Sequence, residues 1–226
     1  HVLEVAHLVG LAHTDWTWSP KFGDFDNDGW VDLFIANGMS RDFVNADLLR
    51  AFRDRGNRNW KETPPLREAN LAFRNRGDLA FEESGASWGL NQLTASFGAA
   101  VGDLDRDGDL DLIVMNFGEP LSVFQNNSTQ GHRLLVRLRG RSGNTWAIGA
   151  SVHVRTANLS VSRTLGLASG FLSANEPVLH FGLGEDSVVQ QLTVTWPQGA
   201  QSTFTHLAAN RFYDITEPDT VLASSP

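Results

Sequence analysis

Two short apolar runs stand out in the first half of the chain, at residues 33–36 and 112–115. Each is rich in strand-forming residues and is followed by a turn signal containing Asn and Gly, which is typical of a buried β-strand. Between these runs, residues 46–53 place Leu48, Leu49 and Phe52 on one side of a helix that Asn45 can cap. The pattern therefore predicts strands interrupted by a helical insertion at 39–69.

Beyond Gln130 the pattern changes to a strict alternation of apolar and polar residues. The alternating segments are 134–139, 150–155, 159–165, 191–196 and 211–216, and turn signals such as Pro197-Gln198-Gly199 separate them. A period of two is expected where one face of a strand lies on a core and the other faces solvent. We therefore predict a mainly β protein whose second part, 131–217, is a β-sandwich or barrel, with 218–226 as a tail.

The first part, residues 1–130, contains an internal repeat. GDFDNDGWVDLFIAN at 23–37 aligns without a gap on GDLDRDGDLDLIVMN at 102–116, and AFRN at 72–75 is echoed by VFQN at 123–126. Repeated units of a few strands are typical of propeller blades, and the insertion at 39–69 explains the long spacing between the two copies. Residue 1 corresponds to the middle of the unit, so we expect an incomplete first repeat and a longer array in the parent protein.

Each repeat carries a string of aspartates with a glycine at its sixth position. Alternating carboxylates and one backbone carbonyl form the oxygen-rich ligand set that Ca²⁺ prefers, and without a cation these carboxylates would repel one another. The expected ligands are Asp24, Asp26, Asp28, Trp30 through its carbonyl and Asp32 in the first loop, and Asp103, Asp105, Asp107, Asp109 through its carbonyl and Asp111 in the second. Position 12 is Ile35 or Val114, which excludes an EF-hand. We predict two structural Ca²⁺ sites, with metal-free polar turns as the alternative.

Composition excludes several classes of protein. The formal net charge is −8, and the nine aspartates of the two strings account for all of this negative charge. The sequence has no basic patch that would bind phosphates, which argues against a nucleic-acid partner. The absence of cysteine excludes disulfides and thiolate metal sites. No apolar run is long enough to span a membrane as a helix, and no signal-peptide pattern opens the chain.

These motifs resemble two known families. The aspartate strings, with LAFRNRGDLAFEE at 71–83, resemble FG-GAP/VCBS repeats, the blade unit of integrin-type β-propellers. The segments that resemble the ASPIC/UnbV domain are LLVRLRG at 134–140, IGASVHV at 148–154, SGFLSANEPVLHFGLG at 169–184, VTWPQGA at 194–200 and NRFYDIT at 210–216. The resemblance implies a partial calcium-binding propeller, a β-domain without an agreed activity, and a secreted or periplasmic location. Phe171 and Ala174 replace residues that are more often Tyr and polar in the family, which argues against a polar site there.

A propeller needs about four to eight blades, so this chain cannot close a ring alone. We therefore expect exposed strand edges. These edges either pair between chains, as in a homo-oligomer, or are covered by the helical insertion. The expected function is a calcium-binding interaction module of the extracellular type, with a protein or glycan partner. A carbohydrate-binding module is an alternative suggested by Trp16, Trp18, Trp60, Trp88 and Trp196, although core packing is the better explanation for most of them.

A hydrolase is the other alternative, because residues 85–89 match the G-x-S-x-G pattern with Ser87 as its nucleophile. A true nucleophile elbow joins a strand to a helix and needs an acid and a histidine later in the chain. Ser87 instead precedes another short predicted strand. The later histidines His132, His153, His180 and His206 lie in or beside predicted strands, where structural roles are expected.

Overall fold

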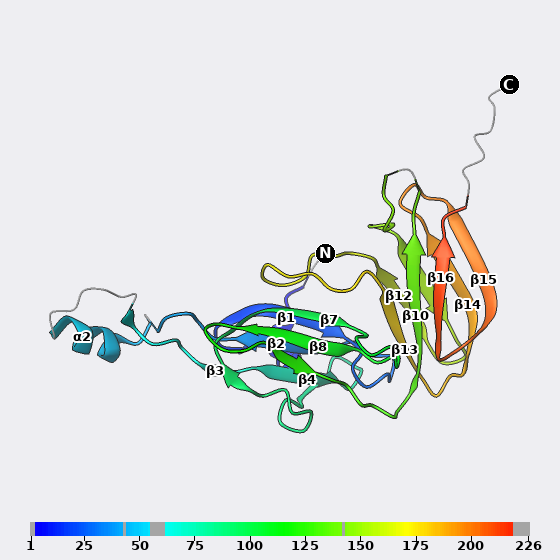
Figure 1. Ribbon diagram of the computed structural model, residues 1–226. Coiled ribbons are helices and arrows are strands. Elements are labelled where there is room, and N and C mark those ends of the chain that lie inside the picture. Colours follow the sequence, from blue (N-terminus) through cyan, green and yellow to red (C-terminus); the bar gives the residue numbers. More distant parts are fainter. Residues whose placement is uncertain (1–2, 43, 55–61, 142, 219–226) are drawn as a thin grey trace.

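The structure is a computed structural model that describes residues 3–42, 44–54, 62–141 and 143–218. The chain is mostly β: two blade-like sheets lie together, and a two-sheet sandwich stands against one end of them (Figure 1). Within the described residues, no sheet closes on itself and no helix is both long and apolar enough to cross a membrane. The architecture confirms the predicted fold class.

The first blade is a four-stranded antiparallel sheet in the order β1-β2-β4-β5. Its strands are β1 (Thr17–Gly23), β2 (Asp32–Asn37), β4 (Leu71–Asn75) and β5 (Phe81–Glu83), and a short helix, α1 (Ala6–Val9), precedes them. All of β2 is buried, as the apolar run at 33–36 predicts. The repeated unit therefore folds as a blade-like antiparallel sheet.

The second blade is a three-stranded antiparallel sheet whose strands are β7 (Ser96–Gly102), β8 (Asp111–Asn116) and β9 (Ser122–Phe124). A two-stranded ladder pairs β3 (Glu68–Ala69), which precedes β4 in the sequence, with β6 (Leu93–Thr94), which precedes β7. Strands β1 and β7 contact each other, and Phe34, Ala36, Leu112 and Val114 join one core cluster. After β9 the chain leaves for the sandwich, so the outer edge of β9 pairs with no described strand.

The insertion contains the predicted helix, α2 (Ala46–Asp54). The Asn45 side chain caps it, because its Oδ1 accepts a hydrogen bond of 3.0 Å from the Leu48 backbone amide. In Figure 1, α2 projects away from both blades, so it covers no strand edge there. The side chain of Phe52 lies outside the described residues, as do Trp60 and the basic residues Arg55, Arg58 and Lys61.

The second part is a sandwich of two sheets, ordered β13-β10-β16 and β12-β11-β14-β15. The strands are β10 (His132–Arg139), β11 (Ser151–Arg155), β12 (Ser160–Thr164), β13 (Leu179–Gly184), β14 (Val188–Thr195), β15 (Gln201–Ala208) and β16 (Arg211–Thr216). The predicted alternating segments all form strands, and β16 has the predicted limits. Strands β13 and β15 were missed because one is buried along almost its whole length and the other is mostly exposed, so neither alternates clearly.

A long loop, residues 166–178 between β12 and β13, extends from the sandwich along β1 and β7 (Figure 1). The fully buried Lys21 of β1 holds this loop, since its Nζ donates to the Ser169 carbonyl and lies 3.1 Å from Asn175 Oδ1. Phe171 packs against Trp18, with ring centroids 4.6 Å apart. The loop therefore fastens the sandwich to the blades, and this contact explains an apolar residue at position 171.

Candidate metal centres

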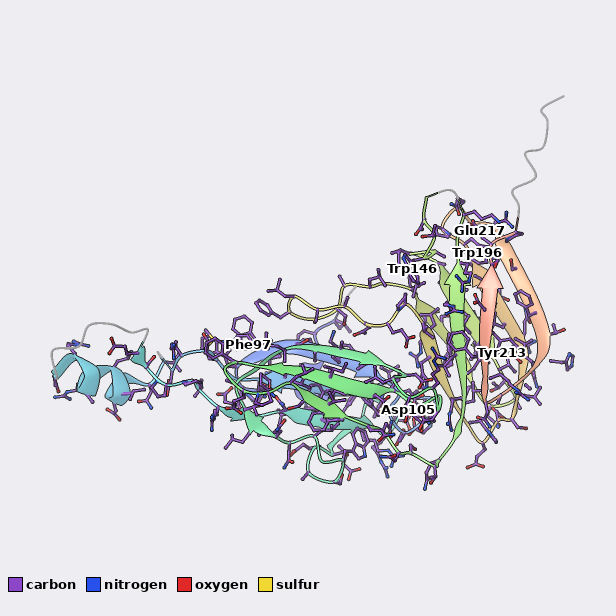
Figure 2. All side chains as sticks on the ribbon, in the orientation of Figure 1. Phe97, Asp105, Trp146, Trp196, Tyr213 and Glu217 are labelled. Carbon is purple, nitrogen blue, oxygen red and sulfur yellow. The ribbon has the colours of Figure 1, made fainter. Side chains whose placement is uncertain are left out.

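The two aspartate strings form matching loops at the end of the blades nearest the sandwich, where Figure 2 labels Asp105. The first loop joins β1 to β2 and the second joins β7 to β8. Asn27 and Arg106 have φ of 60° and 66°, and Gly29 and Gly108 have φ of 95° and 98°. The glycine at the sixth position is needed because side chains other than glycine rarely adopt this conformation.

Asp32, the last carboxylate of the first loop, anchors the loop's backbone. Its Oδ2 accepts a hydrogen bond of 2.9 Å from the Phe25 amide, and its Oδ1 accepts one of 2.8 Å from the Asn75 amide. Asp111 makes the equivalent pair of bonds in the second loop, both 2.8 Å long. The same residue thus sets the loop shape in each repeat, and the Asn that ends the xF-x-N motif supplies one of the donors.

Three carboxylates of the first loop, those of Asp24, Asp26 and Asp28, bring ligand atoms within 4.8 Å of one another. Asp24 is 1% exposed, and its Oδ2 accepts a hydrogen bond of 2.9 Å from the Gly29 amide. The other oxygen of Asp24 and Oδ1 of Asp26 are buried and have no hydrogen-bond partner among the described residues. Buried carboxylate oxygens without a donor are costly, so the arrangement fits a bound cation.

The charges of this loop interact strongly. Burial, together with the neighbouring charges of Asp32 and Asp28, raises the pKa of Asp24 to about 8. Burial also raises the pKa of Asp32 to about 7 and is the largest cause of the raised pKa of Asp26. Arg74 of β4 offsets part of the charge, with its Nε 2.5 Å from Asp26 Oδ2 and its Nη2 3.4 Å from Asp28 Oδ2. A divalent ion would remove the remaining repulsion.

The second loop gathers Asp103, Asp105 and Asp111, again with ligand atoms within 4.8 Å of one another. Asp103 Oδ1 is buried and unpartnered in the described structure, as is its counterpart in the first loop, and burial raises the pKa of Asp103. Gln125 occupies the place that Arg74 has in the first blade, and its Nε2 donates to Asp105 Oδ2 at 2.5 Å. The second loop therefore has a neutral amide where the first has a cation.

Four predicted ligands lie outside these clusters, and one of them is Asp32, whose two carboxylate oxygens both accept from backbone amides. Asp107 Oδ1 accepts a hydrogen bond of 2.9 Å from the Asp109 amide. The buried Asp109 carboxylate accepts one from Asn27 Nδ2 at 2.9 Å. The Trp30 side chain is 48% exposed. The carbonyl roles of Trp30 and Asp109 remain predictions.

Strand β13 of the sandwich lies directly on the first loop. A Cβ atom at Gly182 would lie 2.0 Å from Asp24 Oδ2, so only glycine fits, and the Gly184 amide donates to the Asn27 carbonyl at 2.9 Å. Arg163 of β12 faces Asp24 and counteracts part of the rise in its pKa. The sequence contains the signal for this contact in the glycines of HFGLG, but their partner in the fold is visible only in three dimensions.

The histidines of the sandwich have structural surroundings. Burial lowers the pKa of His180 to about 3, with a further contribution from Arg163, so this imidazole is neutral. Neither of its ring nitrogens has a hydrogen-bond partner in the described part of the chain. His132 contacts Asn210, and His153 contacts Ser160 across the β11-β12 ladder. His206 lies within β15.

Ser87 follows β5 in a turn, and its hydroxyl donates to the Ser84 carbonyl at 3.0 Å. It lines a cavity of about 860 Å³ together with Trp88 and residues of the first aspartate loop, and no described histidine lines that cavity. The contacts of Ser87 therefore supply no general base. The other tryptophans with described side chains include Trp18, packed at the loop contact, and Trp196, which is 1% exposed in the sandwich core (Figure 2).

Comparisons with known proteins agree with these two parts. Residues 24–114 match the family model for the FG-GAP-like repeat, and residues 140–222 match the one for ASPIC and UnbV. The chain is 34% identical over 197 residues to "Cartilage acidic protein 1" of Homo sapiens, a match that covers 80% of this chain and 26% of the relative. It is 31% identical over 236 residues to the Xenopus tropicalis protein of that name, covering 86% of this chain and 36% of the relative. The chain thus spans about a quarter to a third of these relatives, combines FG-GAP-like repeats with an ASPIC/UnbV domain, and is homologous to cartilage acidic protein 1.

Proposed function

We propose that each aspartate loop binds one Ca²⁺ ion and that the chain is a calcium-stabilised interaction module. The observation that carries this proposal is the set of buried carboxylate oxygens without partners among the described residues, at Asp24, Asp26 and Asp103. Two loops of the same shape present such oxygens at equivalent positions. A cation bound there would satisfy both the missing contacts and the charge.

The chemistry of the donors favours calcium. Each cluster consists of carboxylates alone, without a histidine, and the chain contains no cysteine. Hard oxygen donors select Ca²⁺ or Mg²⁺ over zinc or copper, and a flexible loop with many oxygens suits the larger ion. We infer a calcium site in each loop for this reason.

We infer a structural role for these ions because the loops lie at the junction of the two parts. Asp24 is buried beneath Gly182 of the sandwich, and Asp109 is buried between Asn27 and Arg133. An ion that binds only the folded chain stabilises it by mass action. Calcium would therefore strengthen the loops and the contact between the blades and the sandwich together.

The partner is inferred from the surface and from the relatives. The outer edge of β9 pairs with no described strand and offers backbone groups to another one, so we propose that it pairs with a second chain or with another part of the parent protein. The relatives are named for cartilage, an extracellular tissue, which supports a secreted location.

A glycan ligand is a second candidate, supported by the cavity of about 860 Å³ beside the first loop. Its lining combines aromatic rings with amide side chains, among them Trp88, Gln130 and the exposed Asn127. Rings that stack on sugars and amides that bind hydroxyls are the expected features of such a site. Binding on a glycan array that weakens in Asn127→Ala would support it, and the absence of any glycan bound would remove it.

Thermal unfolding with excess Ca²⁺ and with EDTA tests the calcium proposal. At a calcium concentration of about 100 Kd a site contributes about 2.7 kcal/mol, which corresponds to a rise in Tm of about 5–10 °C for a chain of this size. Asp24→Asn should reduce the rise yet fold without metal, because burial and the charges of Asp32 and Asp28 disfavour the charged form of Asp24, and the asparagine oxygen can still accept from the Gly29 amide. Asp78→Asn, in an exposed turn of the same blade, is the matched control. Equal Tm values in calcium and EDTA would contradict the proposal.

A further inference from the structure

The sequence contains three sites with the N-x-S/T pattern, to which secretory enzymes attach N-linked sugars. The sites begin at Asn126, Asn127 and Asn158, and the first two overlap in the run NNST at 126–129. The sugar is joined to the nitrogen of the asparagine side chain, so an occupied site belongs in a surface loop of a secreted protein. The structure distinguishes the three sites because it shows what each side chain already contacts.

Asn126 is held by the fold. Its Nδ2 donates to the carbonyls of Phe25 at 2.7 Å and Leu110 at 3.3 Å. Asn75, the equivalent residue of the first blade, likewise donates to a backbone carbonyl at 3.0 Å. A sugar on Nδ2 of Asn126 would disrupt contacts that belong to the repeated unit, so this site is unsuited to modification.

Asn158 is held in the turn between β11 and β12. Its Nδ2 donates to Asp186 Oδ1 at 2.8 Å, and its backbone amide donates to Asp186 Oδ2 at 3.0 Å. Ser160, which completes the pattern, pairs with Arg155 in the β11-β12 ladder, and its hydroxyl lies 3.0 Å from His153 Nε2. The amide and the hydroxyl of this site are therefore both engaged in the folded chain.

Asn127 differs from both of these residues. It is exposed and lies in a segment, 125–130, that contains neither helix nor strand. Among the residues that the structure describes, its side chain makes one hydrogen bond, a long one of 3.4 Å from Nδ2 to the Gln125 carbonyl. Thr129, which completes the pattern, is also exposed. A long contact at the surface is weak, so the Asn127 nitrogen is available for modification.

The surroundings of Asn127 have room for an attached sugar. Asn127 lines the cavity of about 860 Å³, together with Trp88 and Gln130. An aromatic face and amide groups suit the ring and the hydroxyls of a sugar. An N-acetylhexosamine is uncharged, so the net charge of the carboxylates and the arginine in the lining does not decide whether it fits.

We propose that Asn127 carries an N-linked glycan whose first sugar lies at this cavity. The donor is an oligosaccharide joined through a diphosphate to a lipid carrier. The Asn127 Nδ2 forms a bond to the anomeric carbon and loses one proton, while the bond from that carbon to the diphosphate breaks. The inference rests on the proposed secreted location. It differs from the proposed free glycan ligand because this sugar is covalently attached to the chain.

Expression of the whole chain behind a cleavable signal peptide in a eukaryotic host tests the inference. We expect one glycan that peptide N-glycosidase F releases, and peptide mass spectrometry should locate it at Asn127. Thr129→Ala removes the pattern of Asn127 alone and should abolish the glycan. Ser128→Ala removes the pattern of Asn126 alone and should leave the glycan in place.

Cleavage of the signal peptide shows that the chain entered the secretory pathway. A cleaved chain without a glycan would overturn the inference, as would a glycan that persists in Thr129→Ala. The natural protein, collected outside its cells, should carry the same glycan, and an unmodified Asn127 there would also overturn the inference. Absence of the protein outside its cells would instead contradict the proposed location, and the calcium-dependent Tm tests the calcium sites separately.

Discussion

The side-chain amide of Asn27 donates a hydrogen bond of 2.9 Å to the Asp109 carboxylate, so the two aspartate loops contact each other directly. Both side chains are 1% exposed. Arg133 of the sandwich reaches the same carboxylate, with its Nε 3.2 Å from Oδ1. The two loops and the sandwich therefore share one buried polar contact. A substitution in any one of the three should alter the packing of the other two.

Replacing Asn27 should weaken the fold. Asn27→Gly removes the amide without backbone strain, because glycine adopts the observed φ of 60° readily. The loss of a donor to a buried carboxylate should lower the free energy of unfolding by about 1–3 kcal/mol, measured by urea denaturation. Asn127→Gly, at an exposed position, controls for the entropy that any new glycine adds to the unfolded chain. Equal stabilities of the two variants would contradict the role of Asn27.

The two loops should differ in calcium affinity. Arg74 faces Asp26 in the first loop, whereas the equivalent Gln125 faces Asp105 in the second. Because a cation competes with Ca²⁺, the first loop should bind more weakly, and Arg74→Gln should tighten its binding about three- to tenfold. Isothermal titration calorimetry of both proteins measures this. An unchanged or weaker affinity in the variant would show that Arg74 does not oppose the ion.

Phe171 should anchor the 166–178 loop. Removing its ring in Phe171→Ala loses the contact with Trp18 and should cost about 1–3 kcal/mol, together with a shift in tryptophan fluorescence. Leu172, the next residue, is 91% exposed. Leu172→Ala should therefore stay within about 0.5 kcal/mol of the unmodified chain. If the two variants unfold at the same urea concentration, the contact between Phe171 and Trp18 does not anchor the loop.

Lys21 should make stability depend on alkaline pH. Burial lowers the pKa of Lys21 from 10.5 to about 8, so the folded chain loses this proton at a lower pH than the unfolded chain. Between these two values the unfolded state binds more protons, and the free energy of unfolding should rise with pH. Lys21→Met lacks the titrating group, so the free energy of unfolding of the unmodified chain should rise relative to that of the variant from pH 8 to 10.5. A difference that stays constant over this range would contradict the lowered pKa.

Local patterns in the sequence predict much of the fold. The apolar run at 33–36 gives β2, and the alternation at 211–216 gives β16 with its observed limits. The aspartate strings identify the loops because carboxylate spacing is a local property. Strands β13 and β15 escaped prediction because burial on both faces, or exposure on both, removes the alternation that identifies a strand.

The junction between the two parts could not be predicted, because it depends on contacts between distant residues. Lys21 binds a loop about 150 positions later, and Gly182 makes room for Asp24. The glycines of HFGLG indicate a close approach at Gly182, but nothing in the sequence identifies the partner of either residue.

Counting the calcium ions bound to the chain tests the central claim most directly. Native mass spectrometry of the chelator-treated chain, with Ca²⁺ added back, should show two bound ions at saturation. Asp103→Asn should leave one ion, that of the first loop. Binding of no calcium, or binding of two ions that is unaffected by Asp103→Asn, would contradict the assignment of one site to each aspartate loop.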